Sequence, residues 1–166
     1  MQHALVTYFV GEKRWSLVFV ALGVAAQAAA FAVWRGAGPF RGAALPLAGV
    51  ALIELAVGGT VFLRTDAQVA QLEDQLRREP GAFHAAETAR MTGIMRSFTV
   101  IKTVEIALLG VAVALLLACR PPAFAAGVGL GLLLQAGVTL AADVVAEHRG
   151  RIYLEAVKGA PTTPVP

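Results

Sequence analysis

The sequence predicts an all-α membrane protein: a four-helix transmembrane bundle, up-down-up-down, with helices two and three extended as a cytoplasmic helical hairpin. Three observations predict it. Of the 166 residues, 57% are hydrophobic and only 15% are charged, whereas about a quarter of the residues in a soluble domain are charged. Four long stretches carry almost no charge, and the basic residues gather on one side of them. The composition excludes a disordered chain, and the single Cys119 excludes a disulfide-held scaffold.

Each of the four apolar stretches is close to the roughly 20 residues that a helix needs to cross the hydrocarbon core of a bilayer. Trp15 and Trp34 lie at opposite ends of the first stretch, where interfacial anchors belong. A cleaved signal peptide is the alternative for this stretch, but its apolar run continues without a break to Trp34, which favours a retained signal anchor. The predicted spans are 15–34, 43–63, 97–119 and 122–142, within a single bundle of residues 1–159 followed by a short tail at 160–166.

The basic residues are distributed unequally about these spans. Of the 14 Lys and Arg residues, ten lie on the side that holds both termini and the central connection, three lie on the other side, and Lys102 lies within the third span. The positive-inside rule therefore predicts that both termini are cytoplasmic, with the chain in a cell membrane such as the bacterial inner membrane. Because the topology accounts for the basic excess, we expect the lipid bilayer and its anionic headgroups, and not a nucleic acid, as the partner.

The connection between the second and third spans, residues 64–96, has a helical spacing of apolar residues on both sides of Pro80-Gly81. Proline ends one helix and glycine allows the reversal, so this segment predicts two antiparallel helices that project from the membrane. Arg64 and Arg96 each lie 16 residues from Pro80, which puts both at the same height on the membrane surface. If the protein has a protein partner, we expect this hairpin to dock it.

Ionisable residues within the spans are the main candidates for function. By the same count from Pro80, Glu54 and Glu105 lie at nearly one depth, near mid-membrane. Lys102 precedes Glu105 by three residues, so the two side chains share a helix face and can pair. Charged groups within a span cost about 2.5 to 3.5 kcal/mol each, so they face the bundle interior. The predicted ligand- or ion-binding set adds uncharged polar residues at similar depth and consists of Gln27, Glu54, Lys102, Glu105, Gln135 and Thr139.

With Lys102 charged, the two glutamates leave one excess negative charge unless a proton or cation is shared. The set therefore predicts a small multi-pass membrane protein that binds a proton, a cation or a small ligand, with translocation as the further step such a site allows. A purely structural role is the alternative, in which the polar side chains hold the register of the four helices. A non-catalytic accessory protein that docks a partner through the hairpin is a second alternative.

The chain contains none of the standard catalytic sequence patterns, such as a P-loop, G-x-S-x-G, H-E-x-x-H or C-x-x-C. An enzyme is therefore the less favoured class, and the sequence names no cofactor. The enzymatic alternative is a lipid-modifying enzyme at the cytoplasmic interface that uses His84, Glu87 and Arg90.

His84 and Glu87 are three residues apart on a predicted helix, a spacing that occurs in carboxylate-bridged metal sites of helix bundles. Such a site needs ligands from neighbouring helices, and Glu147 and His148 are the candidates on the fourth helix. A solvated His–Glu pair is the alternative.

Gly127 and Gly131 form a G-x-x-x-G spacing in the fourth span, which allows a close helix contact. A homo-oligomer is one consequence, although such spacings also arise by chance in a chain rich in alanine and glycine.

Overall fold

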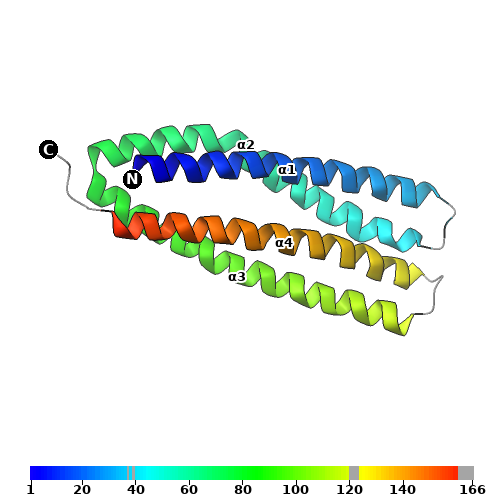
Figure 1. Ribbon diagram of the computed structural model, residues 1–166. Coiled ribbons are helices and arrows are strands. Elements are labelled where there is room, and N and C mark those ends of the chain that lie inside the picture. Colours follow the sequence, from blue (N-terminus) through cyan, green and yellow to red (C-terminus); the bar gives the residue numbers. More distant parts are fainter. Residues whose placement is uncertain (37, 39, 120–123, 161–166) are drawn as a thin grey trace.

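The computed structural model describes residues 1–36, 38, 40–119 and 124–160. Within these residues the chain is helical and no strand occurs. Figure 1 shows the helices side by side, with the start of α1, the end of α4 and the α2–α3 turn at one end, which we call the end that holds the termini. The end of α1, the start of α2, the end of α3 and the start of α4 lie at the opposite end. The elements are α1 (Gln2–Arg35), the short 3₁₀ helix η1 (Arg41–Ala43), α2 (Ala44–Arg78), α3 (Pro80–Ala118) and α4 (Phe124–Gly159).

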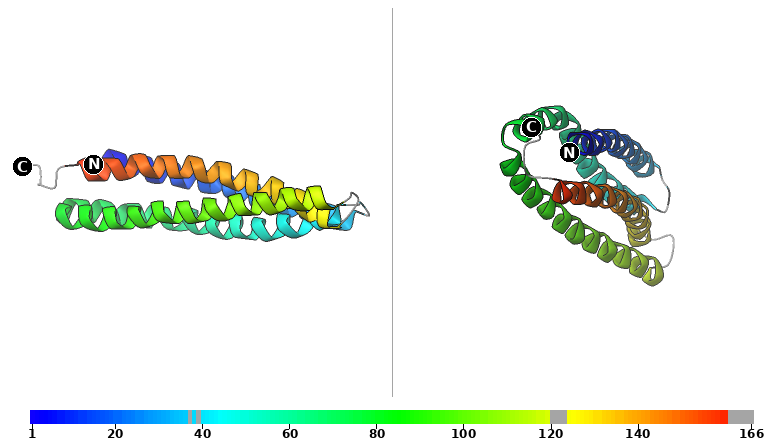
Figure 2. Two further views of the ribbon diagram at one scale, coloured as in Figure 1. Left: turned by 90° about the horizontal axis from the view of Figure 1, so that it is seen from below. Right: turned by 60° about the vertical axis from the view of Figure 1, so that its left-hand side comes forward.

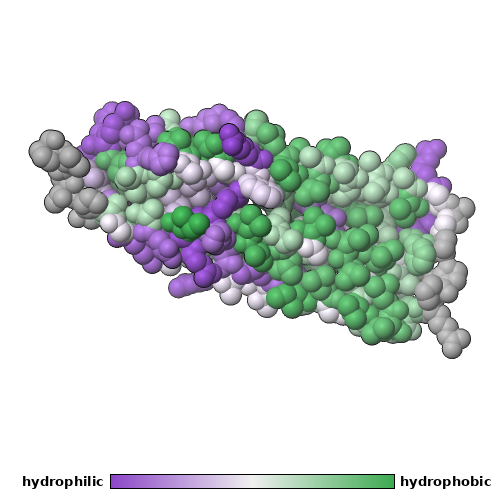
Figure 3. All heavy atoms as spheres, in the orientation of Figure 1, coloured by the Kyte–Doolittle hydropathy of each residue, from purple (hydrophilic) through white to green (hydrophobic). Residues whose placement is uncertain are grey.

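All four α-helices are long and apolar enough to cross a membrane, which confirms the predicted all-helical class. They contain 34 to 39 residues, which at about 1.5 Å per residue is well beyond the roughly 30 Å of a hydrocarbon core. On the face shown in Figure 3, hydrophilic side chains gather at the end that holds the termini, and hydrophobic side chains cover most of the opposite half up to a few hydrophilic ones at its tip. Each helix therefore has an apolar part and a polar extension.

The polar extension of α1 lies before the predicted span of residues 15–34, in a segment without a helix prediction from the sequence. The structure continues that helix back to Gln2. Leu5 and Phe9 lie on one face of this extension and are buried against the other helices. Tertiary packing therefore stabilises a helical segment that has too few regularly spaced apolar residues to be recognised from the sequence. α4 ends at Gly159, and the connection at 120–123 and the predicted tail beyond Ala160 lie outside the described residues.

The predicted break between α2 and α3 is present, but it is shorter than expected. Only Glu79 separates the two helices, with φ −138° and ψ 68°. Pro80 is the first residue of α3, a position where its missing N–H costs nothing, and proline also excludes the residue before it from the helical region. The role expected of Gly81 was wrong, because this glycine lies inside α3 and needs no left-handed backbone.

The helices form two closely packed pairs, α1 with α2 and α3 with α4, as the right-hand view in Figure 2 shows. Glycines mark the closest approaches within the first pair. A Cβ on Gly58 would lie 2.8 Å from the Ser16 carbonyl oxygen, and one on Gly23 would lie 3.1 Å from that of Ala51. Within the second pair, a Cβ on Gly129 would lie 2.9 Å from the Ala112 carbonyl oxygen. Small residues therefore set the packing inside each pair, as is usual in membrane bundles.

Gly127 and Gly131 join the two pairs at the end opposite the termini. A Cβ on Gly127 would lie 2.8 Å from the Phe40 carbonyl oxygen, and one on Gly131 would lie 2.7 Å from that of Ala43. The G-x-x-x-G face is thus occupied by η1 and the start of α2 in the same chain. A homo-oligomer stays a prediction, and it would need another surface.

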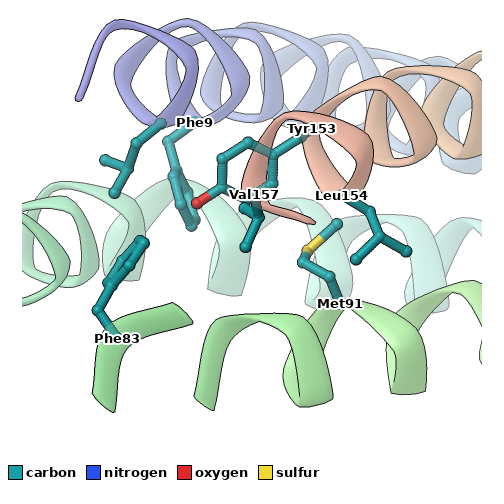
Figure 4. Close-up of a cluster of buried hydrophobic side chains, with 7 residues drawn as sticks. Phe9, Phe83, Met91, Tyr153, Leu154 and Val157 are labelled. Carbon is teal, nitrogen blue, oxygen red and sulfur yellow. The ribbon is translucent and has the colours of Figure 1, made fainter. Parts of the chain in front are cut away.

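At the end that holds the termini, the polar extensions enclose a second contact between the pairs (Figure 4). Tyr8 of α1 stacks on Tyr153 of α4 with ring centroids 4.5 Å apart. This core lies beside the chain termini and away from the most apolar part of the helices. Its buried members are Leu5, Phe9, Phe83, Met91, Tyr153, Leu154 and Val157.

Candidate functional site

The polar groups of the apolar region converge on one row of side chains along α4. Its members recur every four positions, so each lies about one turn from the next and is offset by about 40° around the helix. Gln135 and Glu147 are buried, and Thr139 and Asp143 are partly buried between them. We call this row the α4 polar stripe, and it consists of Gln135, Thr139, Asp143, Glu147 and Arg151.

Glu54 of α2 faces the start of this stripe, at Gln135. Only 3% of Glu54 is exposed, and the Gln135 amide is its polar neighbour. Neither carboxyl oxygen of Glu54 has a hydrogen-bond partner among the described residues. A buried carboxylate without partners is strongly disfavoured, so this group requires a proton or a cation.

Glu105 faces the next turn of the stripe from α3. It is 7% exposed and lies beside Thr139, whose hydroxyl already donates to the Gln135 carbonyl oxygen at 3.1 Å. Within the described part of the chain, its Oε2 atom is buried without a partner. Asp143 lies close enough for its charge to act on Glu105. The structure thus brings two buried carboxyls to neighbouring turns of α4.

The sequence spacing suggested that Lys102 pairs with Glu105, but in the structure it does not. Its ammonium group binds Glu147, one helix away. Arg151 donates to the other oxygen of the same carboxylate at 2.7 Å. The cation of the predicted set therefore pairs with a carboxylate nearer the end that holds the termini. Among the described residues Glu54 and Glu105 form no ion pair, while the charge of Lys102 still acts on Glu105.

Gln27 lies apart from this cluster. It lines a shallow pocket of about 410 Å³ between α1 and α2, together with Trp34 and Ala48. Its Oε1 atom is buried and has no hydrogen-bond partner among the described residues. We call this the Trp34 pocket.

A second hollow lies nearer the termini, between the two helix pairs. This interhelix cavity has a volume of about 360 Å³ and is lined by all four helices. On α2 its lining begins at Val57, whereas that of the Trp34 pocket ends at Ala48. Glu54 lies between them, so its backbone is about 4.5 Å along the axis from one hollow and about 9 Å from the other.

His84 and Glu87, the proposed metal ligands, are engaged in other contacts. The Nδ1 atom of His84 lies 3.0 Å from the Val157 carbonyl oxygen. Arg90 donates two hydrogen bonds to Glu87, of 2.7 and 2.6 Å, and the Tyr153 hydroxyl donates a third at 2.9 Å. No group of three or more metal-ligating side chains occurs in the described ranges. The metal prediction and the enzyme alternative gain no support from this geometry.

The Lys102–Glu147–Arg151 group predicts a pH dependence of stability. Hydrogen bonds from Lys102 and then Arg151 hold the pKa of Glu147 below its usual 4.5. A carboxyl whose pKa falls on folding adds stability above its unfolded-state pKa and loses it as the pH drops through the folded-state value. In detergent, we expect the melting temperature to decrease as the pH is lowered past 4.5. The Glu147→Gln variant should lose part of this decrease. The same pH profile in both proteins would contradict this assignment.

Sequence reasoning missed Asp143 and the partner of Lys102. A four-residue spacing of polar groups along 135–151 was the available signal. No family model, curated protein or solved structure matches this chain.

Proposed function

We propose that this chain is a small multi-pass membrane protein that binds a proton or a cation at Glu54 and Glu105 and moves it across the bilayer. The observation that carries the proposal is a pair of buried carboxyls without basic partners, on either side of one polar helix face. Intramembrane carboxyls of this kind are typical of proton and ion pathways.

The positions of the two hollows support movement as well as binding. Glu54 lies on α2 between the linings of the Trp34 pocket and the interhelix cavity. Gln27 offers an unpartnered acceptor on one side, and Asp143 lines the cavity on the other while also lying near Glu105. A proton could therefore reach the buried carboxyls from either side of the membrane, because only a short stretch of α2 separates Glu54 from each hollow.

The proposed topology follows from the charges. The four helices cross the membrane up-down-up-down, with the termini and the α2–α3 turn in the cytoplasm, because most basic residues lie at that end. Arg41, at the other end, donates to the Trp34 carbonyl oxygen at 2.7 Å and stacks over its ring at 5.7 Å. An aromatic residue and a cation together are a common interfacial anchor. The interhelix cavity then opens at the cytoplasmic side of the bilayer.

The proposal is tested by proton flux in proteoliposomes that enclose a pH-sensitive dye, driven by a potassium diffusion potential. We expect Glu54→Gln/Glu105→Gln to lower the flux at least about tenfold, because neutral amides cannot exchange the proton or hold the cation. The same assay in sodium or potassium gradients identifies the ion.

Glu155→Gln serves as the matched control, because it removes an exposed carboxyl from the same protein. Wild-type flux no greater than that of empty vesicles, or equal flux in the double variant, would overturn transport. A lower melting temperature of the double variant with unchanged flux would favour the structural alternative.

A further inference from the structure

The interhelix cavity has a polar end and an apolar end. The apolar end lies within the spans and is formed by aromatic and branched side chains such as Phe19, Phe98 and Ile101. Arg64, Arg90 and Arg149 line the polar end. The change from one end to the other occurs at the level of Trp15, the predicted interfacial anchor.

The arginines are held in place but keep donors free. Arg149 donates to Glu12 at 3.0 Å and to the Gly11 carbonyl oxygen at 3.4 Å, and its guanidinium lies 5.3 Å from the Trp15 ring centre. Its Nε atom is buried and has no partner among the described residues. A buried guanidinium N–H without an acceptor is costly, and an oxyanion in the cavity would satisfy it.

Arg90 is fixed in the same way. Glu87 and the sulfur of Met91 receive the hydrogen bonds from its Nε and Nη2 atoms, and its guanidinium lies 5.5 Å from the Phe9 ring centre. The Nη1 atom is left with no such bond in the part of the chain that is described. Glu87 is a positioning residue here, because it sets the guanidinium at the cavity wall without lining the cavity itself.

The charge of the lining also favours an anion. Three arginines face two carboxyls, those of Glu12 and Asp143. Burial raises the pKa of Glu12 against the opposing effect of Arg149, which limits the negative charge that this carboxyl adds. Arg64 is exposed and forms no ion pair within the described residues.

We infer that the interhelix cavity binds the oxyanion headgroup of an anionic membrane lipid, with the first part of its acyl chain against the apolar end. Arginine is suited to such headgroups because its planar fork donates two parallel hydrogen bonds to one phosphate or carboxylate. The acyl chain of the lipid would then lie between the two helix pairs. The same cavity forms the cytoplasmic approach to Glu54 and Glu105 in the proposed function, but lipid binding there does not rest on ion binding at those carboxyls.

The two tryptophans of the chain allow a direct test. Trp34→Phe leaves Trp15 in the cavity wall, and Trp15→Phe leaves Trp34 at the other end as the control. Each protein is placed in phosphatidylcholine vesicles and titrated with lipids brominated near the start of the acyl chain. We expect brominated phosphatidylglycerol to quench Trp15 at about tenfold lower mole fraction than brominated phosphatidylcholine, with no such preference at Trp34.

Charge variants assign the preference to the cavity. Arg149→Gln and Arg64→Gln should each remove most of the preference for anionic lipid that the quenching of Trp15 shows. Arg14→Gln, which removes an exposed charge outside the cavity at the same height, should keep it. Brominated phosphatidic acid and a brominated fatty acid distinguish phosphodiester, phosphomonoester and carboxylate headgroups.

Two results would overturn the inference. Equal quenching of Trp15 by anionic and zwitterionic lipid would show that the cavity does not select charge. An equal loss of preference in Arg14→Gln would show that only the general surface potential attracts the lipid. Because Arg64 is exposed and unpaired among the described residues, its variant keeps the test decisive even if Arg149→Gln fails to fold.

Discussion

Arg90→Met should lower the free energy of unfolding by about 3 kcal/mol, because it leaves the charge of a buried carboxylate uncompensated. Glu87 is only 2% exposed, and after the substitution the Tyr153 hydroxyl would be its remaining hydrogen-bond donor. The measurement is chemical or thermal unfolding in mild detergent.

Two variants show whether charge is the cause. Glu87→Gln/Arg90→Met keeps an acceptor for Tyr153 and removes the uncompensated charge, so it should recover about half of the loss. Arg78→Met breaks an exposed ion pair with Asp74, of 3.0 Å, and should cost less than about 0.5 kcal/mol. If the double variant were as unstable as Arg90→Met, lost packing and not charge would explain the effect.

Gly131→Ala should destabilise the protein by about 1 to 3 kcal/mol, because its methyl group has no room. The added Cβ would lie 2.7 Å from the Ala43 carbonyl oxygen and 2.6 Å from Cγ of Pro46. Neither backbone nor proline ring can move aside alone, so α4 must separate from η1 and the start of α2. Unfolding in detergent measures the loss.

Gly137→Ala is the matched control on the same helix, since nothing lies within 4 Å of its added Cβ. Alanine favours a helix over glycine by about 0.5 to 1 kcal/mol, so this variant should be unchanged or slightly more stable. Opposite signs for the two variants would confirm that η1 packs on α4. Equal effects would contradict that contact.

Much of the fold could be predicted because membrane insertion depends on local composition. A run of about 20 apolar residues needs no knowledge of its neighbours to be assigned to a helix in lipid. Pro80 likewise places a helix start by its own chemistry. The first residues of α1 could not be assigned in this way, because Leu5 and Phe9 are held by side chains from α3 and α4.

The candidate site was only partly predictable for a related reason. Sequence depth put Glu54 and Glu105 near one level, and the structure places both against the α4 polar stripe. Spacing along one helix could not reveal that Lys102 reaches Glu147 on another. Gln27 matched the others in depth but lies in a separate pocket, since depth alone does not say which way a side chain points.

The sequence by itself determined the solvent, the number of apolar helices and the few ionisable groups within them, because each follows from which residues are neighbours along the chain. The tertiary structure decided which of those groups lack a partner and where arginines gather around a cavity. Those properties depend on contacts between residues far apart in sequence, such as Arg149 with Glu12, and only packed helices bring such residues together.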